Sequence, residues 1–246
     1  MKKRLLVLGL AFTMFAATAC GTSSDGGNKT SKADKTVTAT SNSDKTSETQ
    51  KNDDKKDDAK ESYKSADDIT MDDLKNHEET PAEDFKYRDK SNGEAVIKEY
   101  TGDDPIVVIP NEIDGKKVVD FGKIFTNNKD IVAVRVGDNV ENIKEGAFGN
   151  CDNLKYIILG KNVKVFEHGN VGGKKFEQLE LNDGLEQLGE EGTSGAVIIL
   201  NKDKVEVKIP ESVNHMAFTG AKTLIVKAGS YAESFAKEHN MDYRVE

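Results

Sequence analysis

The chain has 246 residues and a formal net charge of −9. An acidic chain is not drawn by charge to nucleic acid or to anionic lipid, so composition excludes both as charge-driven partners. Between Gly21 and Asp68 there is no Leu, Ile, Phe or Met, and such a stretch cannot bury enough apolar surface to offset its chain entropy. The foldable part is therefore one domain, residues 84–246, which excludes a large multidomain enzyme.

The first residues have the order of an export signal. Basic residues at positions 2–4 precede an apolar run that begins at Leu5, and small residues at positions 16–19 lead to Cys20. The apolar run is shorter than the about 20 residues that a membrane-spanning helix needs. We therefore predict that residues 1–19 are a signal peptide and not a permanent transmembrane anchor.

The residues Ala17-Thr18-Ala19-Cys20 resemble the lipobox of bacterial lipoproteins. The resemblance implies that Cys20 is lipidated and becomes the first residue of a mature protein anchored to the extracytoplasmic face of the cell membrane. The alternative is an ordinary secretory signal in which Cys20 is incidental. The only other cysteine is Cys151. If Cys20 carries lipid, no disulfide can form, and we expect Cys151 to be a buried free thiol.

Residues 20–81 are predicted to form a disordered tether that begins at the lipidated cysteine. They mix Ser and Thr with both signs of charge and show no apolar period. The acidic and basic run at positions 53–58 lacks the turn-forming Gly of a calcium loop and is interpreted as a solvated segment. Ile69, Met71 and Leu74 would permit one helical turn or a short docking segment, but we assign them to the tether.

Four apolar positions recur through the rest of the chain with identical internal steps of two, four and three residues. A Pro, Gly or Asn follows each short strand and marks a turn. One such unit cannot cover its own apolar face, so the units must stack as a solenoid of short parallel strands. The full copies are Val134, Val136, Val140 and Ile143; Ile157, Leu159, Val163 and Phe166; Leu179, Leu181, Leu185 and Leu188; and Val207, Ile209, Val213 and Met216, after a partial copy of Val107, Ile109 and Ile113.

The motifs Ile109-Pro110 and Ala147-Phe148, with Cys151, Leu154 and Ile157 after the latter, resemble BspA-type leucine-rich repeats. The resemblance covers about residues 85–246 and implies a buried position for Cys151. Residues 166–176 and 188–196 lack the Ala-Phe pair and are rich in Gly, so we expect loops there rather than helical turns.

Both ends of the solenoid carry signals of a cap. Alternating apolar residues on either side of Ser91-Asn92-Gly93 predict a β-hairpin before the first repeat. Ser230 and Glu233 have the spacing of a capping box and predict a final helix, followed by a strand near Tyr243. The predicted fold class is thus a β-rich leucine-rich-repeat solenoid with irregular or short helical convex segments, an N-terminal β-hairpin cap and a C-terminal helical cap.

The sequence contains no motif of an enzyme. The four histidines do not lie near a cysteine or serine in a spacing typical of nucleophilic catalysis, and the Gly-rich segment 169–173 lacks the Lys-Ser/Thr of a phosphate-binding loop. We therefore expect no catalytic residue, no cofactor and no metal.

Side chains that point away from the core form a stripe on the outer face of the sheet, because alternate residues of a strand face opposite sides. Arg135, Ile158, Glu180 and Lys208 occupy this position, and Tyr156 lies in the neighbouring column. Arginine and aromatic side chains often dominate protein interfaces. We take these five as candidate ligand-binding residues; the alternative is that they only satisfy cross-strand packing.

The resemblance to BspA-type repeats implies a cell-surface lipoprotein. Such a protein would bind a host or bacterial surface protein, or another macromolecule, and would include adhesion among its roles. The alternative is an envelope enzyme or a solute-capturing lipoprotein whose site the sequence does not reveal.

Overall fold

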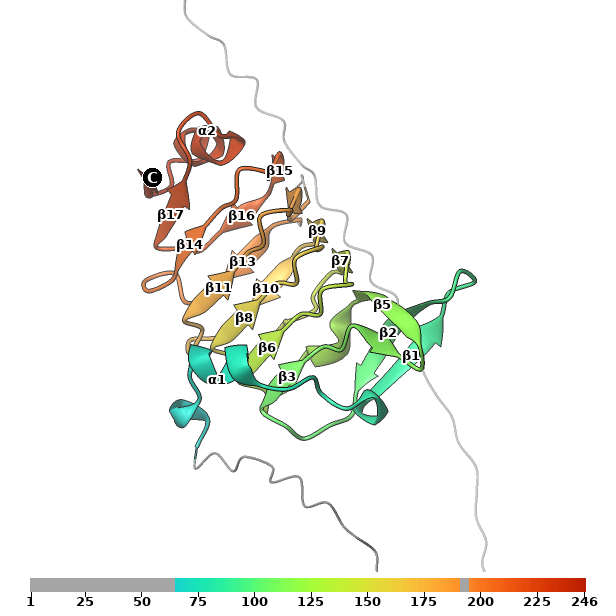
Figure 1. Cartoon of the computed structure of the whole chain (residues 1–246). Helices are drawn as coiled ribbons and strands as arrows, with labels where there is room; N and C mark the ends of the chain where they lie inside the picture. The colour runs from blue at the N-terminus through green and yellow to red at the C-terminus, as the bar shows by residue number, and fades with distance from the viewer. Residues whose placement is uncertain (1–64, 191–194) are drawn as a thin grey trace, which may run out of the picture. The chain divides into compact units, whose positions relative to one another are not determined.

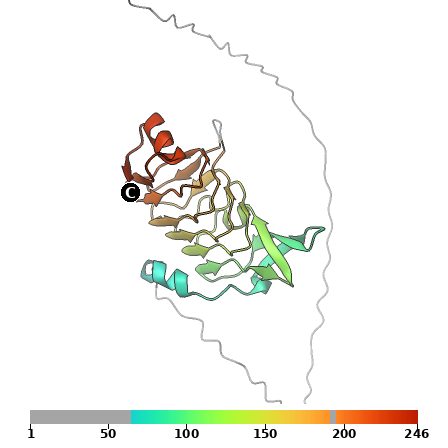
Figure 2. The same ribbon diagram turned by 45° about the horizontal axis from the view of Figure 1, so that its top comes forward.

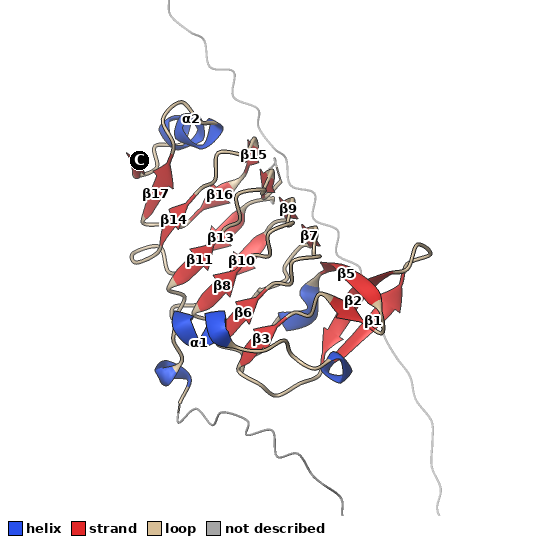
Figure 3. Cartoon of the chain, viewed as in Figure 1, coloured by secondary structure: helices blue, strands red, loops and turns tan. Residues whose placement is uncertain are grey.

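A computed structural model describes residues 65–190 and 195–246 of the chain (Figure 1). These residues form a parallel β-solenoid of about six turns with little helix, which is evident when the ribbon is coloured by secondary structure (Figure 3). The predicted solenoid of short parallel strands is confirmed. No helix within the described ranges is long and apolar enough to span a bilayer.

One strand from each turn contributes to a front sheet, whose outer surface we call the front face. Val134, Ile157 and Leu179 are direct neighbours across its first part, so the register is the one that the repeats predict. The first part contains the parallel strands β3 (Ile106–Val108), β6 (Ala133–Arg135), β8 (Tyr156–Ile158) and β11 (Gln178–Glu180), and the second contains β14 (Glu206–Lys208), β17 (Thr223–Val226) and β18 (Tyr243–Val245).

A second sheet runs along the other side of each turn and joins the N-terminal hairpin to the repeats. Its order is β1, β2, β5, β7, β9, β12 and β15, with β4 paired to β5. The bounds are β1 (Phe85–Asp89), β2 (Glu94–Tyr100), β4 (Glu112–Ile113), β5 (Lys116–Phe121), β7 (Asn142–Ile143), β9 (Val165–Phe166), β12 (Gln187–Leu188) and β15 (His215–Met216).

The convex segments of the later turns form a third, short parallel sheet. It contains β10 (Gly169–Val171), β13 (Val197–Ile199) and β16 (Phe218–Thr219). The expectation of loops at residues 166–176 and 188–196 is therefore wrong for β10, which pairs with β13 directly after the second of these segments. Val171 and Val197 are buried, and this burial favours strands. In the earlier turns the convex side is irregular, with the short 3₁₀ helix η3 (Lys123–Phe125).

The core lies between the sheets and consists of the repeating apolar positions. All members of the repeat copies are buried except Leu181, which is half-buried. Phe125 stacks on Phe148 with ring centroids 5.9 Å apart, and Phe121 meets both rings edge-on. Close stacking of the turns requires glycine, since a Cβ on Gly160 would lie 2.2 Å from the carbonyl oxygen of Gly137.

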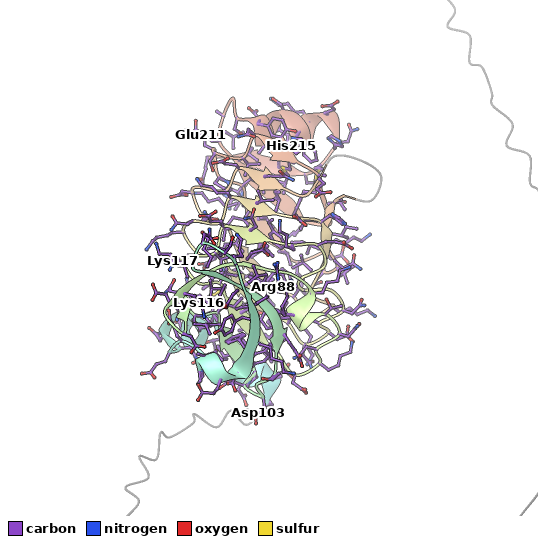
Figure 4. All side chains as sticks on the ribbon, turned by 90° about the vertical axis from the view of Figure 1, so that its right-hand side faces the viewer. Arg88, Asp103, Lys116, Lys117, Glu211 and His215 are labelled. Atoms are coloured by element: carbon purple, nitrogen blue, oxygen red, sulfur yellow. The ribbon has the colours of Figure 1, made fainter. Side chains whose placement is uncertain are left out.

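Both predicted caps are present. β1 and β2 form an antiparallel hairpin whose turn contains Gly93 at a φ of +79°. At the far end α2 (Tyr231–Glu238) begins at Ser230, whose side chain accepts a hydrogen bond from the Glu233 amide, and β18 then pairs with β17. Figure 4 shows Lys116 and Lys117 toward the hairpin end and Glu211 and His215 toward the C-terminal end.

The domain begins earlier in the sequence than we predicted. Residues 65–81 were assigned to the tether, but they contain the 3₁₀ helix η1 (Ala66–Asp68) and the helix α1 (Met71–Asn76), and η2 (Ala82–Asp84) follows them. Ile69 and Leu74 are fully buried, which is the physical reason that this part is ordered. The predicted signal peptide, Cys20 and the rest of the tether lie outside the described residues.

Candidate functional site

The front face brings the five predicted ligand-binding residues onto one surface. Arg135, Ile158 and Glu180 are direct partners across β6, β8 and β11, and Lys208 pairs with Ile225 in the second part of the sheet. Tyr156 occupies the neighbouring column and pairs with Gln178. The predicted alternation of inward and outward side chains is therefore correct.

The N-terminal half of this face is covered by residues 65–80, which we call the strap (Figures 1 and 2). Ile69 and Leu74 of the strap are fully buried in a cluster with side chains of β3, β6 and β8. Tyr156 is only 8% exposed as a result, and Ile158 packs against the same cluster. The expectation that the whole stripe is open to solvent is thus wrong for its first half.

The strap forms because its sequence combines two helix-start signals. The Thr70 hydroxyl accepts from the Asp73 amide at 3.2 Å, and the Asp73 carboxylate accepts from the Thr70 amide at 2.7 Å, which completes a capping box. A hydrogen bond that the Thr70 hydroxyl donates to the Asp73 carboxylate at 2.7 Å, followed by the one from the Thr70 amide, lowers the pKa of Asp73. Ile69 and Leu74 stand immediately before the cap and four positions after it, the spacing of a hydrophobic staple. This pattern was the signal that sequence reasoning missed.

Two cations of the repeats bind the carbonyl ends of the strap helices. The Lys155 ammonium donates to the Ile69 carbonyl at 2.9 Å and to the Asp67 carbonyl at 3.4 Å, at the end of η1. The Arg135 guanidinium donates to the carbonyl of His77, the residue that caps α1. Positive charge is favourable at the carbonyl end of a helix. Lys155 therefore stabilises η1 in its docked position, and Arg135 does the same for α1.

Lys155 is a buried lysine and was not among the predicted residues. Its side chain is 9% exposed, with the ammonium 3.8 Å from a Glu177 carboxylate oxygen and 5.0 Å from the centre of the Tyr156 ring. The Tyr156 hydroxyl donates to Glu177 at 2.8 Å. Burial, followed by this hydrogen bond, raises the pKa of Tyr156 to about 12. Sequence alone gives no sign of the role of Lys155, because the carbonyl oxygens that it binds lie in the strap.

Ion pairs at the rim of the strap add little to its stability. Lys75 lies 2.9 Å from Glu180 and Lys175 lies 3.1 Å from Asp67, but these side chains are exposed to solvent, where such pairs contribute about 0–1 kcal/mol. Burial of Ile69 and Leu74 contributes about 1.5–3 kcal/mol each. Burial of these two side chains therefore stabilises the docked strap more than its surface ion pairs do.

Thr80 joins the end of the strap to the edge strand β3. Its amide donates to the Val108 carbonyl at 3.0 Å, and its hydroxyl accepts from the Val108 amide at 2.9 Å. Thr80 thereby covers the open edge of the front sheet. Across the described ranges, the bond from the Thr80 amide to the Val108 carbonyl is the only backbone-to-backbone hydrogen bond between the strap and the solenoid.

The C-terminal half of the front face is open, and a hollow of about 490 Å³ lies where β11 meets β14. From β8 to β11 and from β14 to β17, the residue after the first strand donates to the next strand: Leu159 to Glu180 and Ile209 to Ile225, both at 2.9 Å. No backbone hydrogen bond joins Leu181 to Lys208 in the part of the chain that the structure describes. This interruption explains why Leu181 is half-buried and not fully inside as predicted.

The side chains around this hollow carry both signs of charge over a partly apolar floor. Glu206 and Lys208 are exposed, Glu206 lies 3.5 Å from Arg244, and Lys208 forms an ion pair with Glu246. Ile225 and Leu181 are half-buried in the lining. The mixture of polar rim and apolar floor suits contact with another macromolecule.

The His and acidic side chains of the described residues form contacts but no metal-binding group. In residues 65–190 and 195–246, no group of three or more His, Cys, Asp or Glu side chains is placed to hold a metal ion. His168 lies 3.6 Å from Glu190 and 3.8 Å from Glu145, and His239 stacks on Phe235 with ring centroids 4.0 Å apart. These contacts involve no Ser or Cys side chain that would act as a nucleophile.

Comparison with known proteins identifies the fold. The sequence matches no protein-family model and no curated protein. The leucine-rich repeat protein TpLRR of T. pallidum is 24% identical over 60% of this chain and 71% of its own, with a TM-score of 0.50. A leucine-rich repeat protein from Bacteroides ovatus is 20% identical over 58% of this chain and 48% of its own, with a TM-score of 0.41. The likeness to TpLRR shows that this chain has the fold of a leucine-rich repeat solenoid.

Proposed function

We propose that this chain is a lipid-anchored cell-surface protein that uses its leucine-rich repeat solenoid to bind a protein or another macromolecule outside the membrane, with adhesion as one role. The anchor is Cys20, and residues between Cys20 and the strap connect it to the solenoid. The protein needs no cofactor and acts without catalysis.

The observation that carries the binding function is the open half of the front face. Stacked parallel strands hold Glu180, Glu206 and Lys208 at fixed spacing around the hollow, with Ile225 beside them. A rigid surface loses little conformational entropy when it binds, which favours recognition of an extended partner surface. The lipobox resemblance and the BspA-type motifs support the location and the class of partner.

The charge pattern of this surface indicates what kind of partner suits it. The whole chain is acidic, whereas the open half pairs acidic and basic side chains. A neutral or basic partner surface therefore meets less repulsion than an acidic one. Moderate salt should slow association more than it speeds dissociation.

The function is tested by binding of the purified full chain to host matrix proteins, to other bacteria and to cell-wall fragments. For whichever target binds, Lys208→Ala with Glu206→Ala is expected to weaken binding at least fivefold. The matched control is Lys86→Ala with Glu99→Ala, which removes an exposed ion pair of 2.9 Å on the hairpin. Equal loss in the two variants would remove the open half as the site, and turnover of a small molecule would favour the envelope enzyme instead.

A further inference from the structure

We propose that the covered half of the front face is a second binding site, which takes a short amphipathic helical segment of a partner protein, and that the strap fills this site within the same chain until such a segment displaces it. The inference concerns a different half of the face from the proposed function and does not depend on the lipid anchor.

The occupant's chemistry can be read from the contacts that hold the strap. An apolar pocket over β3, β6 and β8 receives Ile69 and Leu74, which flank the start of α1. Lys155 and Arg135 then bind carbonyl oxygens at the ends of the two short helices. A competing segment therefore needs two apolar side chains at the spacing of Ile69 and Leu74. It also needs a short helix whose last carbonyl groups lie over Lys155 or Arg135.

The strap is attached in a way that permits its release. Ile69 and Leu74 belong to an apolar cluster that is separate from the main core of the solenoid. Before Thr80, no backbone-to-backbone hydrogen bond joins the described strap to the solenoid, and each of its hydrogen bonds to the solenoid involves a side chain. Departure of the strap would thus leave the stacked turns and their core in place.

The surface beneath the strap has the composition of a binding site. Tyr156, Ile158 and Arg135 would become exposed, and such aromatic and arginine side chains often supply most of an interface's energy. The Lys155 ammonium would lose both of its carbonyl partners. The uncovered face would therefore bind another segment that offers apolar side chains and carbonyl oxygens, as the strap does.

The strap has an advantage over a free segment because it belongs to the same chain. A short connection gives a tethered ligand an effective concentration on the order of millimolar. A free peptide is consequently excluded from the wild-type protein, and it binds once the strap is weakened. If the strap fills a binding site, a free peptide binds the weakened variant more tightly than the wild type. If the face is not a binding site, the peptide binds neither protein.

The test uses the full chain and a fluorescein-labelled synthetic peptide of residues 65–80. Leu74→Asp places a charge in the apolar pocket and releases the strap, whereas Asn76→Asp adds the same charge at an exposed position of α1. Fluorescence polarisation should show saturable binding to the Leu74→Asp protein that is at least tenfold tighter than to the wild type or to Asn76→Asp. A peptide that itself carries Leu74→Asp should not bind.

A second measurement keeps the proposal testable if Leu74→Asp does not fold. Hydrogen exchange of the wild-type chain should show the Leu74 amide opening at least tenfold more often than amides of β6 and β8. Exchange of the strap only with global unfolding would overturn the proposal, as would a folded Leu74→Asp protein that fails to bind the peptide. A wild-type dimer formed by exchange of straps would instead assign the face to a second copy of this chain.

Discussion

Cys151 shows how one side chain of the repeat is fixed by its surroundings. It is fully buried, and its thiol donates to the Phe125 carbonyl at 2.9 Å beside the Phe125–Phe148 stack. Among the described residues it is a free cysteine. The sequence-based expectation of a buried free thiol is therefore confirmed for this position.

Burial raises the pKa of Cys151 to about 12, and this has a consequence for stability. The pKa of the thiol in an unfolded chain is about 8.5, so the folded protein holds the proton more tightly. The resulting stabilisation is complete below about pH 8.5 and is lost as the pH rises toward 12, at about 1.4 kcal/mol per pH unit. Urea unfolding between pH 8 and 10 should show the wild type losing stability relative to Cys151→Ala, with a slope that approaches this value toward pH 10.

The same burial predicts that Cys151 resists thiol reagents in the native protein and reacts after denaturation. A stability difference between wild type and Cys151→Ala that is independent of pH, or rapid labelling of the native thiol, would contradict the assignment.

At the scale of elements, the cap of α1 controls the strap. Thr70→Ala removes the hydroxyl that accepts from the Asp73 amide, and loss of such a cap costs about 1 kcal/mol. The Leu74 amide, which donates to the Thr70 carbonyl at 3.3 Å, should then exchange with solvent about fivefold faster. Thr101→Ala removes an exposed hydroxyl outside the strap and should leave this rate unchanged. Equal rates in wild type and Thr70→Ala would mean that the cap does not support the strap.

The register of the front sheet makes a second prediction at this scale. Leu159 is 5% exposed and points into the core, so Leu159→Ala should cost about 2–5 kcal/mol of unfolding free energy. Ile158→Ala should cost less, because Ile158 faces the strap, and Leu181→Ala should also cost less, because the joint between β11 and β14 is open. Urea midpoints in the reverse order would shift the register by one residue.

Different elements were predictable to different degrees, for physical reasons. The front strands follow from the sequence because each turn repeats the same apolar spacing and must bury it. The strap was assigned to the tether because Asp67, Asp68, Asp72 and Asp73 make it polar, and its two apolar side chains find their pocket on repeats far away in the sequence. The third sheet was missed because its Gly-rich segments lack a periodic pattern.

The sequence predicted which side chains share the front face, but it did not predict which of them are exposed to solvent. Arg135, Ile158 and Glu180 do share one face, since alternation along a strand is a local property. Whether another segment covers that face is a tertiary property, and Lys155 acquires its role only through that cover. The open joint beside Leu181 is likewise a tertiary property, because it depends on whether Leu181 finds a backbone partner on β14.

At the scale of the whole molecule, a binding solenoid acts at a surface only if its chain is attached there. Cys20 is the predicted point of attachment, and two or three acyl chains would hold an acidic protein on the membrane, at about 0.8 kcal/mol per buried CH₂. Cys20→Ala should therefore release the protein into the medium or leave its precursor uncleaved, and it should abolish metabolic labelling with a fatty acid. Cys151→Ala is the matched control, because it removes the other cysteine and should retain the label. Fatty-acid labelling that persists in Cys20→Ala would place the lipid on another residue. If the wild-type protein is cleaved and released without any label, it is a secreted protein and has no lipid anchor.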